Sequence, residues 1–312
     1  MDLTNKLIDL ANDYKIRVFE ESDFVPDKST STGKDGYVNI YEAYEKANPS
    51  NKVMIKKFQR IAEATIMGLH SRQGQFVQER MWKYFKRECR VWNCDGIDHP
   101  NIIRFLGVMK QPDLQLPVFV TQLASLGNLY MCIVDGRAKT FELHKKMKLM
   151  CDVAEGLSFL HKRDVVHRDL KPSNIMLNRD SDGSEKALLG DFGSAKDLQG
   201  MLEFEVSTHM ATIAYCSPEH LQNPREISSA KDMWSFGCVL AEFVTCTIGL
   251  WPPEQRVESV QLSLLRGEHP PRPPSLSETD TIWIFIEACC WCKKPEERVT
   301  AKEAASELIQ IK

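Results

Sequence analysis

The sequence predicts an α+β protein in which a small β-rich part precedes a larger, mostly helical part. Up to about residue 123, short segments of alternating apolar residues, separated by turn residues, predict a small antiparallel sheet. From residue 145 onward, apolar residues recur at helical spacing instead. A chain of 312 residues with 43% hydrophobic content can bury a core large enough for two such parts.

The first part combines predicted strands with two helical segments. Leucines at helical spacing over residues 1 to 15 predict a short amphipathic helix, which either packs on the sheet or docks to a partner. Residues 59–93 are mostly helical in pattern and strongly basic, so they present either a solvated face or a docking surface for a phosphate or acidic partner. The predicted strands cover residues 37–44, 53–56, 99–108 and 118–121, with turns at 48–51 and 111–113.

The second part begins after a connector at 123–127. A long helix is expected over 145–161, because its apolar residues fall on one side. A polar stretch at 178–185, rich in Asp, Ser and Gly, predicts a hairpin between short strands. Further helices are expected over 229–248, 254–266, 278–292 and 300–311.

Composition excludes several classes of protein. The formal net charge of -3 argues against a protein that binds nucleic acid or a membrane surface. Ten cysteines without a secretory signal indicate reduced thiols, so we expect a cytoplasmic location with nuclear access left open. The cluster of Cys289, Cys290 and Cys292 lacks a second set of ligands at metal-binding spacing. The apolar run over 233–251 contains Glu242 and predicts a buried helix, with no membrane span.

Two segments carry the chemistry. Residues 167–174 read His-Arg-Asp-Leu-Lys-Pro-Ser-Asn, and Asp191-Phe192-Gly193 begins 22 residues after Asp169. Phosphoryl transfer needs a carboxylate to orient the attacking hydroxyl, oxygen ligands for Mg²⁺ and a cation against the developing charge. Asp169 fits the first task, Asn174 and Asp191 the second, and Lys171 the third.

These segments resemble the H-R-D-x-K-x-x-N catalytic loop and the D-F-G magnesium loop of the eukaryotic-type protein kinase family. The resemblance implies a bilobal fold with a small antiparallel β-rich lobe, one main helix in that lobe, and a large helical lobe. It implies ATP and Mg²⁺ as cofactors and protein substrates as partners. The expected reaction transfers the γ-phosphoryl group of Mg-ATP to a serine or threonine hydroxyl.

The phosphate-binding elements of the family have counterparts near the N-terminus. Residues 31–38 are similar to the glycine-rich loop: Gly33 and Gly36 supply small residues, while Ser31 replaces the first glycine. Lys56, at the end of the match Val-Met-Ile-Lys, is expected to hold the α- and β-phosphates. Met54 departs from the family's usual alanine above the adenine.

A glutamate on the helix that follows is expected to pair with Lys56. Glu88 lies 11 residues before His99, close to the family spacing, whereas Glu79 lies 20 before it. We therefore assign the pairing to Glu88 and expect the extra residues before it to form a separate short helix. Trp92, one turn later, is expected to join a hydrophobic spine with Phe105, His167 and Phe192.

The adenine pocket is expected around residues 121–124. Aligning Gly127-Asn128-Leu129 with the G-S-L that follows the family's hinge makes Thr121 the residue at the back of the pocket. Backbone groups of Gln122, Leu123 and Ala124 would then bind adenine. Val38 and Met176 are expected to hold the ring between them.

The later motifs imply a scaffold and a regulatory segment. Cys216-Ser217-Pro218-Glu219 resembles the A-P-E end of the activation segment, and Glu219 is expected to pair with Arg298. Asp232 is expected to anchor the backbone of the catalytic loop. Arg168 is expected to bind a phosphate that an upstream activating kinase would place on Ser207 or Thr208. Thr212 is expected to bond Asp169 and Lys171.

The predicted domain organisation is an N-terminal extension over 1–24 and a kinase domain over 25–311, with the small lobe ending near 123. Cys290-Trp291 and the stretch from His99 are features of the tyrosine-kinase-like branch, while Lys171 is the serine/threonine form of the loop. The alternative is a catalytically weak pseudokinase, acting as a scaffold or allosteric partner, which the departures at Ser31, Met54 and Ala211 favour.

Overall fold

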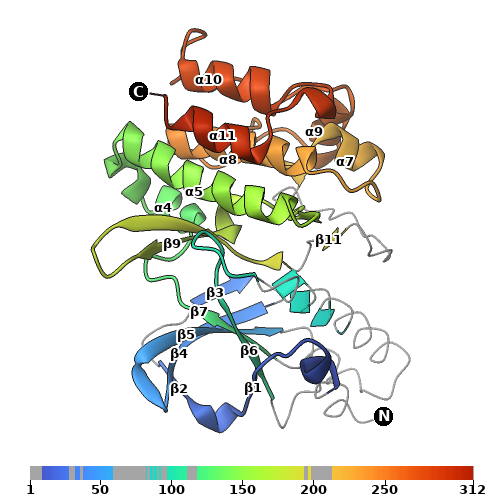
Figure 1. The fold of residues 1–312 in the computed structure, drawn as a ribbon. Helices are drawn as coiled ribbons and strands as arrows, with labels where there is room; N and C mark the ends of the chain where they lie inside the picture. The colour runs from blue at the N-terminus through green and yellow to red at the C-terminus, as the bar shows by residue number, and fades with distance from the viewer. Residues whose placement is uncertain are drawn as a thin grey trace. The chain divides into compact units, whose positions relative to one another are not determined.

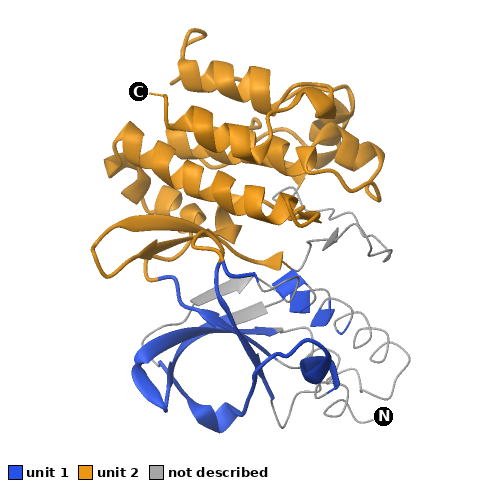
Figure 2. Cartoon of the chain, in the orientation of Figure 1, with its two compact units in different colours: residues 1–98, 103–124 blue, residues 99–102, 125–312 orange. Residues whose placement is uncertain are grey.

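The computed structural model describes most of the chain as two compact units. It describes residues 9–27, 32–35, 38–58, 82, 85–86, 88–89, 91–92, 97–110, 118–192, 196–197 and 213–311, with the backbone alone for 32–35, 38–39, 58 and 196–197. The first unit comprises residues 1–98 and 103–124, and the second comprises 99–102 and 125–312 (Figure 2). One unit is built on a β-sheet and the other is mostly helical, so the predicted α+β class is confirmed (Figure 1).

The first unit is a curled sheet (Figure 1). Its strand order is β1-β6-β7-β5-β4-β2, with β3 paired to β4, and every pair except β1 with β6 is antiparallel. The strands are β1 (Val18–Phe19), β2 (Phe24–Pro26), β3 (Thr32–Asp35), β4 (Val38–Glu45), β5 (Asn48–Phe58), β6 (Phe105–Met109) and β7 (Val118–Gln122). Strand β1 lies before residue 25 and β2 begins at Phe24, within the predicted N-terminal extension, and the boundary of that extension stays a prediction.

Successive side chains of strand β5 point to opposite faces of the sheet, and this alternation decides on which face Lys56 lies. Val53 and Ile55 are buried in a core with Val120 and Met109, so Lys56 points to the opposite face of the sheet. Lys56 is directly opposite Phe119 on β7, and Phe119 belongs to the core of that second face. The period of the strand therefore places the lysine on the face that the helical segment 82–92 covers.

That helical segment packs by its aromatic side chains. Trp82 stacks on Phe85 at 5.4 Å between ring centroids, and Phe85 stacks on Phe119 at 4.7 Å. Residues 9–13 are also helical, and Leu10 is buried in the same cluster, as expected if the N-terminal helix packs on the sheet. A 3₁₀ turn, η1 (Glu21–Asp23), joins β1 to β2. Residues 1–8 and 59–81 lie outside the described part of the chain.

The turn expected at 48–51 is wrong by a few residues. Glu45 pairs with Asn48, so the hairpin closes around Lys46 and Ala47 and β5 begins at Asn48. The register then shifts, since Tyr44 pairs with Lys52, and residues 49–51 form an irregularity within the strand. Pro49 has no N–H to donate to a ladder, and a bulge is the position in a strand that tolerates it.

The second unit is mostly helical, with two small two-stranded sheets. Its elements are α4 (Leu129–Val134), η2 (Arg137–Thr140), α5 (Leu143–His161), β8 (Val165–Val166), η3 (Pro172–Asn174), β9 (Ile175–Arg179), β10 (Glu185–Leu189), β11 (Lys196–Asp197), α7 (Pro218–Gln222), α8 (Ala230–Thr245), α9 (Val257–Leu265), α10 (Thr281–Phe285), η5 (Ile286–Cys290), η6 (Pro295–Glu297) and α11 (Ala301–Leu308). The helix expected over 278–292 is shorter, because Asp280 caps its first turn and the chain changes to a π-turn at Ile286.

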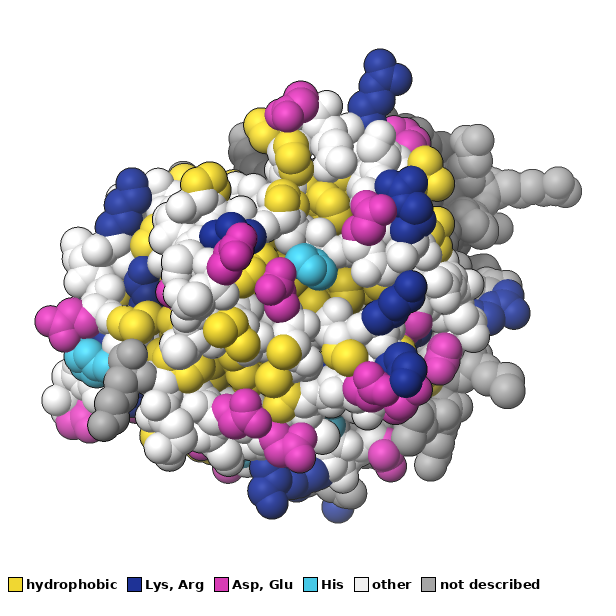
Figure 3. Space-filling view, turned by 90° about the horizontal axis from the view of Figure 1, so that it is seen from above, with side chains coloured by type: hydrophobic (Ala, Val, Ile, Leu, Met, Phe, Trp, Pro, Cys, Tyr) yellow, Lys and Arg dark blue, Asp and Glu magenta, His cyan; other side chains and the backbone are white. Residues whose placement is uncertain are grey.

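Helix α8 forms the centre of this unit. Its residues from Lys231 to Phe243 are all buried, as expected for the apolar run beginning at Met233. No helix in the described part of the chain is both long and apolar enough to cross a membrane. Exposed apolar side chains lie on the outer helices instead: Leu262 and Leu265 on α9, and Ile284 on α10. On the end of the unit that carries α10, apolar groups lie among acidic and basic side chains (Figure 3).

Candidate active site

The β9–β10 hairpin brings Asn174 and Asp191 together. Ile175 is paired with Leu189, so Asn174 lies just before one strand at the point where Gly190 and Asp191 leave the other. The Gly190 N–H donates to the Asn174 carbonyl at 2.9 Å, which extends the register by one step. Two segments separated in the sequence thus meet at the open end of a hairpin.

Asp232 holds the backbone of the segment that precedes Asn174. This carboxylate is fully buried on α8 and accepts hydrogen bonds from the N–H groups of His167 and Arg168, each at 2.8 Å. The ring of His161, at the end of α5, lies 2.8 Å from the same carboxylate. Burial alone would raise the pKa of Asp232, but the hydrogen bond and positive charge of His161, together with the hydrogen bond from the Arg168 N–H, outweigh it and hold the pKa below its ordinary value.

His161 is a positioning residue that the sequence did not reveal. Its place at the end of a predicted helix gives no signal of a contact with a residue 71 positions away. The anchoring also explains the backbone of Arg168, which lies in the left-handed region at φ 67°. The left-handed conformation costs a non-glycine residue roughly 1 to 2 kcal/mol, so surrounding contacts must hold Arg168 in it.

His167 links this segment to the Asp191 segment. It is fully buried, its ring lies against Phe192 at 5.3 Å, and its Nε2 lies 3.0 Å from the Gly190 carbonyl. Since Nε2 must donate to that carbonyl, Nδ1 is the acceptor for the Asp169 N–H at 3.4 Å. A neutral histidine in one tautomer therefore satisfies both contacts.

Asp169 is held from one side. Its Oδ2 accepts a hydrogen bond from Asn174 Nδ2 at 3.1 Å and pairs with Lys171 Nζ at 2.9 Å. Asn174 also donates to the Asp169 carbonyl at 2.7 Å. Within the described residues, the other carboxylate oxygen, Oδ1, has no hydrogen-bond partner. A carboxylate fixed through one oxygen with the other available is suited to accept a proton from an incoming hydroxyl.

Asn174 and Asp191 supply the oxygen ligands that Mg²⁺ prefers. Because the amide nitrogen of Asn174 is used on Asp169, its carbonyl oxygen is the atom left for a cation. Asp191 adopts φ 59°, again in the left-handed region, where a functional constraint is commonly found. The donor set of these two residues therefore fits a magnesium ion on a phosphate.

In the first unit, Lys56 and Glu88 form an ion pair. Lys56 Nζ lies 3.4 Å from Glu88 Oε1, and both side chains are largely buried. Glu88 follows Phe85 by three residues, so the stacking of Phe85 on Phe119 sets the helix in position for this pair. The structure thus places at Lys56 the glutamate that the spacing selected, while Glu79 lies outside the described residues.

The segment expected to bind adenine ends strand β7. Thr121 and Gln122 are its last residues, and Gln122 N–H donates to the Arg104 carbonyl at 2.8 Å. Leu123 and Ala124 follow β7 and lie outside any helix or strand of the described chain. Backbone groups outside regular structure are ones that a ligand can use. Met176 lies on β9, bridged to Asn128.

Several predicted residues lie in parts of the chain that the structure describes by their backbone alone or not at all. The backbone alone is described for Gly33 in β3 and for Val38 in β4. The remaining predictions concern positions outside the described residues: Ser31 and Gly36, the phosphorylation candidates Ser207 and Thr208, Thr212, the turn at 111–113, and most of the basic segment 59–93. Of the expected spine, Trp92 stacks on Phe105 at 5.4 Å within the first unit.

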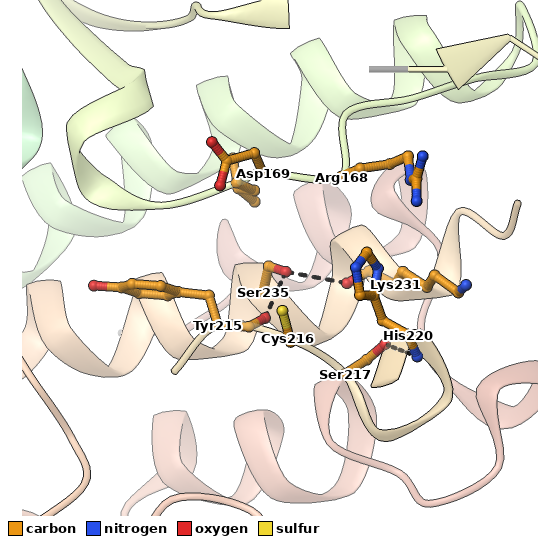
Figure 4. Close-up of a pocket in the computed structure, with 9 residues that line it drawn as sticks. Arg168, Asp169, Tyr215, Cys216, Ser217, His220, Lys231 and Ser235 are labelled. Carbon is orange, nitrogen blue, oxygen red and sulfur yellow. Dashed lines mark hydrogen bonds between the residues drawn. The ribbon is translucent and has the colours of Figure 1, made fainter. Parts of the chain in front are cut away.

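A small polar pocket lies beside Asp169 in the second unit (Figure 4). Asp169 and Arg168 lie on one side of it, and Cys216, His220 and Ser235 on the other. The Ser235 hydroxyl donates to the Tyr215 carbonyl at 2.8 Å, which fixes the wall of the pocket to α8. Burial and the neighbouring cations Arg168 and Lys231 lower the pKa of His220 to about 4, so its ring is neutral near pH 7.

The wall of this pocket is held at its other end by a buried ion pair. Arg298 binds Glu219 through two parallel hydrogen bonds of 2.5 and 2.9 Å, as the sequence predicted. Arg298 also donates to the carbonyls of Cys292 and Ala230. Burial alone would raise the pKa of Glu219, but the arginine outweighs it and lowers that pKa. The ion pair of Glu219 and Arg298 therefore has a structural role.

The chain belongs to the protein kinase domain family. The family model for the protein kinase domain matches residues 33–308, which include both units. The match confirms the resemblance drawn from the two motifs and, with the β-rich and helical units, the bilobal kinase fold. Domains of this family use ATP.

The chain is similar in sequence to protein kinases whose names state different specificities. The chain is 28% identical over 281 residues to a probable cyclin-dependent kinase 8 of Dictyostelium discoideum, covering 89% of this chain and 64% of that protein. It is 29% identical over 224 residues to the serine/threonine/tyrosine-protein kinase HT1 of Arabidopsis thaliana, covering 71% and 53%. It is 32% identical over 207 residues to the mouse tyrosine-protein kinase Srms, covering 66% and 39%. The chain thus matches less than two thirds of each of these relatives.

Proposed function

We propose that this protein transfers the γ-phosphoryl group of Mg-ATP to serine or threonine hydroxyls of protein substrates. The observation that carries the proposal is the state of Asp169, whose Oδ2 is held by Lys171 and Asn174 while its Oδ1 has no partner among the described residues. The two contacts at Oδ2 fix the orientation of the carboxylate, and Oδ1 is the oxygen available to the hydroxyl of an acceptor.

The residues around Asp169 take complementary roles. Lys171, 2.9 Å from the carboxylate, supplies positive charge against the charge that develops on the transferred group. Asn174 and Asp191 would hold Mg²⁺, which neutralises charge on the phosphates when it is bound. Lys56, paired with Glu88, would hold the α- and β-phosphates.

The nucleotide base has a matching set of residues. Leu123 and Ala124, which lie outside any helix or strand, would offer backbone groups to adenine, with Gln122 beside them and Thr121 at the back of the pocket. Val38 and Met176 would hold the ring, and residues 31–36 with Gly33 and Gly36 would cover the phosphates. Because Mg-ATP is multiply charged, fixed donors and cations at these positions supply binding and orientation together.

The choice of serine or threonine rests on Lys171. In the family this lysine belongs to the serine/threonine form of the loop, while the relatives named above include a cyclin-dependent kinase, a serine/threonine/tyrosine-protein kinase and a tyrosine-protein kinase. The upstream activating kinase and a docking partner for the basic segment 59–93 remain part of the proposal. The described cysteines are all free, which supports a reducing compartment, and we place the protein in the cytoplasm.

The test is incorporation of labelled phosphate from Mg-ATP into a mixed peptide library, followed by phosphoamino-acid analysis. We expect label on serine and threonine. Label on tyrosine alone would overturn the assigned specificity. A wild-type chain that neither binds Mg-ATP in a thermal-shift titration nor labels any peptide would support the pseudokinase alternative instead.

A further inference from the structure

Side-chain contacts join helices α5 and α8 at both ends of the pair. The two helices pack together and run antiparallel, because residues at opposite ends of each are in contact. At one end, His161 of α5 meets Asp232 of α8, next to the segment that carries Asp169. At the other end, Lys146 Nζ donates to the Val244 carbonyl at 3.1 Å and to the Cys246 thiol sulfur at 3.0 Å.

The environment of Lys146 is unusual for a buried amine. The residue is only 7% exposed, and the ring of Phe243 lies 5.7 Å from its nitrogen. Over the described ranges, no carboxylate forms an ion pair with it. Buried ammonium groups ordinarily pair with carboxylates, because desolvation of an isolated charge is expensive. Here Lys146 donates instead to the Val244 carbonyl and to the sulfur of Cys246.

Cys246 is held where it can react. Its backbone caps α8 in the left-handed conformation at φ 53°, with its N–H directed to the carbonyls of Glu242 and Phe243. The thiol also contacts the Phe243 carbonyl at 3.6 Å. Since Cys246 is only partly buried, a small oxidant can reach the sulfur from solvent. The Lys146 nitrogen, 3.0 Å away, places a second oxidisable atom beside the same sulfur.

The geometry points to an oxidative cross-link between Lys146 and Cys246, in which one oxygen atom bridges the side-chain nitrogen and the sulfur. Hydrogen peroxide is the oxidant. The separation of 3.0 Å is one that an inserted oxygen atom can span after a small movement, whereas a direct bond between nitrogen and sulfur would require a much closer approach. The site does not depend on the proposed catalytic activity.

The chemistry balances with two molecules of peroxide. The first oxidises the thiol to a sulfenic acid and leaves as water. The second oxidises the amine, after loss of its extra proton to solvent, to a hydroxylamine and also leaves as water. Condensation of the hydroxylamine oxygen with the sulfenic sulfur forms the N–O–S bridge and releases the sulfenic hydroxyl with one hydrogen as a third water. A dithiol reductant cleaves the O–S bond: it restores the Cys246 thiol, leaves the hydroxylamine on Lys146 and is itself oxidised to a disulfide.

Cys292 provides a matched comparison within the same unit. It is also partly buried, but its thiol lies 3.4 Å from a carboxylate oxygen of Glu297. A carboxylate oxygen offers no nitrogen to join. Peroxide should therefore leave Cys292 without a link to lysine under conditions that bridge Cys246.

The experiment is mass spectrometry of the whole protein after brief peroxide treatment, followed by digestion without reductant. We expect a peptide pair joined through Lys146 and Cys246, heavier than the two reduced peptides together by one oxygen and lighter by two hydrogens. Dithiothreitol should release it. The pair should disappear in Cys246→Ser and in Lys146→Arg, which retains the positive charge, and persist in Cys292→Ser.

Three results would overturn the inference. In one, wild-type Cys246 remains a thiol while Cys292 becomes oxidised. In another, Cys246 is oxidised to sulfinic or sulfonic acid with no peptide attached to Lys146. In the third, the linked pair lacks the additional oxygen. Each is read on the wild-type chain, so the conclusion does not depend on a variant that fails to fold.

Discussion

Replacing Asp232 should remove the anchor of the active-site segment without removing a residue that takes part in the proposed chemistry. The carboxylate accepts two backbone hydrogen bonds and contacts His161, and it is fully buried. Asp232→Asn keeps its size, but one side of the group becomes a donor. If the amide oxygen takes the place of Oδ2, the amide nitrogen then faces the N–H of Arg168, where neither group can accept.

The magnitude follows from these contacts. One buried N–H left without an acceptor costs about 1 to 3 kcal/mol, and two hydrogen bonds that lose their charged acceptor weaken by about 1 kcal/mol in total. We therefore expect Asp232→Asn to lower the free energy of unfolding by about 2 to 4 kcal/mol, and Asp232→Ala, which removes all the acceptors, by about 4 to 6 kcal/mol. These are large fractions of a total of about 5 to 15 kcal/mol.

Urea unfolding at pH 7, followed by tryptophan fluorescence, measures the effect. Because the pKa of Asp232 lies below its ordinary value, the contribution is present at neutral pH and is lost only as the pH falls through that lowered pKa. Asp182→Asn, in the exposed turn between β9 and β10, is the control and should change stability little. If Asp232→Ala lowers the free energy of unfolding by less than about 1 kcal/mol, the reasoning is refuted, because three buried donors without acceptors should cost more than that.

The remaining predictions concern the Lys56 ion pair and a buried glutamate. Glu88→Gln should lower turnover about 10- to 100-fold by releasing Lys56, while Glu79→Gln should have little effect; steady-state kinetics with a peptide substrate would show the reverse if the alignment is wrong. Burial raises the pKa of Glu242 to about 7 despite hydrogen bonds from Gly249 N–H and the Tyr215 hydroxyl. A raised pKa means that stability present below the ordinary carboxylate pKa is lost as the pH rises through 7, by about 3 kcal/mol in total. Urea unfolding at pH 5 and 8 should show this loss in wild type and much less of it in Glu242→Gln, and equal pH dependence in both proteins would contradict the assignment.

The segment 167–174 illustrates what the sequence could predict. Its residue types match the needs of phosphoryl transfer, so the roles of Asp169 and Asn174 could be proposed before any coordinates were available. The spacing to His99 selected Glu88, and the structure pairs it with Lys56. In both cases the information is local: a motif of fixed spacing, or a helix at a known distance from a landmark.

Contacts between distant segments could not be predicted in the same way. The pairing of His161 with Asp232 and of Lys146 with Cys246 depends on how α5 packs against α8, which no local pattern encodes. The turn at Lys46 and Ala47 was misplaced because Asn48 and Pro49 are strong turn residues in isolation, while cross-strand pairing accommodates them inside β5.

The measurement that tests the central claim most directly is the rate of phosphoryl transfer by the wild-type chain and by Asp169→Asn at saturating Mg-ATP. Asp169→Asn retains the size of the side chain and removes the carboxylate oxygen proposed to take the proton from the acceptor. We predict a rate at least about 100-fold lower, with the thermal midpoint and Mg-ATP binding unchanged. A variant that transfers phosphate at the wild-type rate would contradict the role of Asp169 and the account built on it.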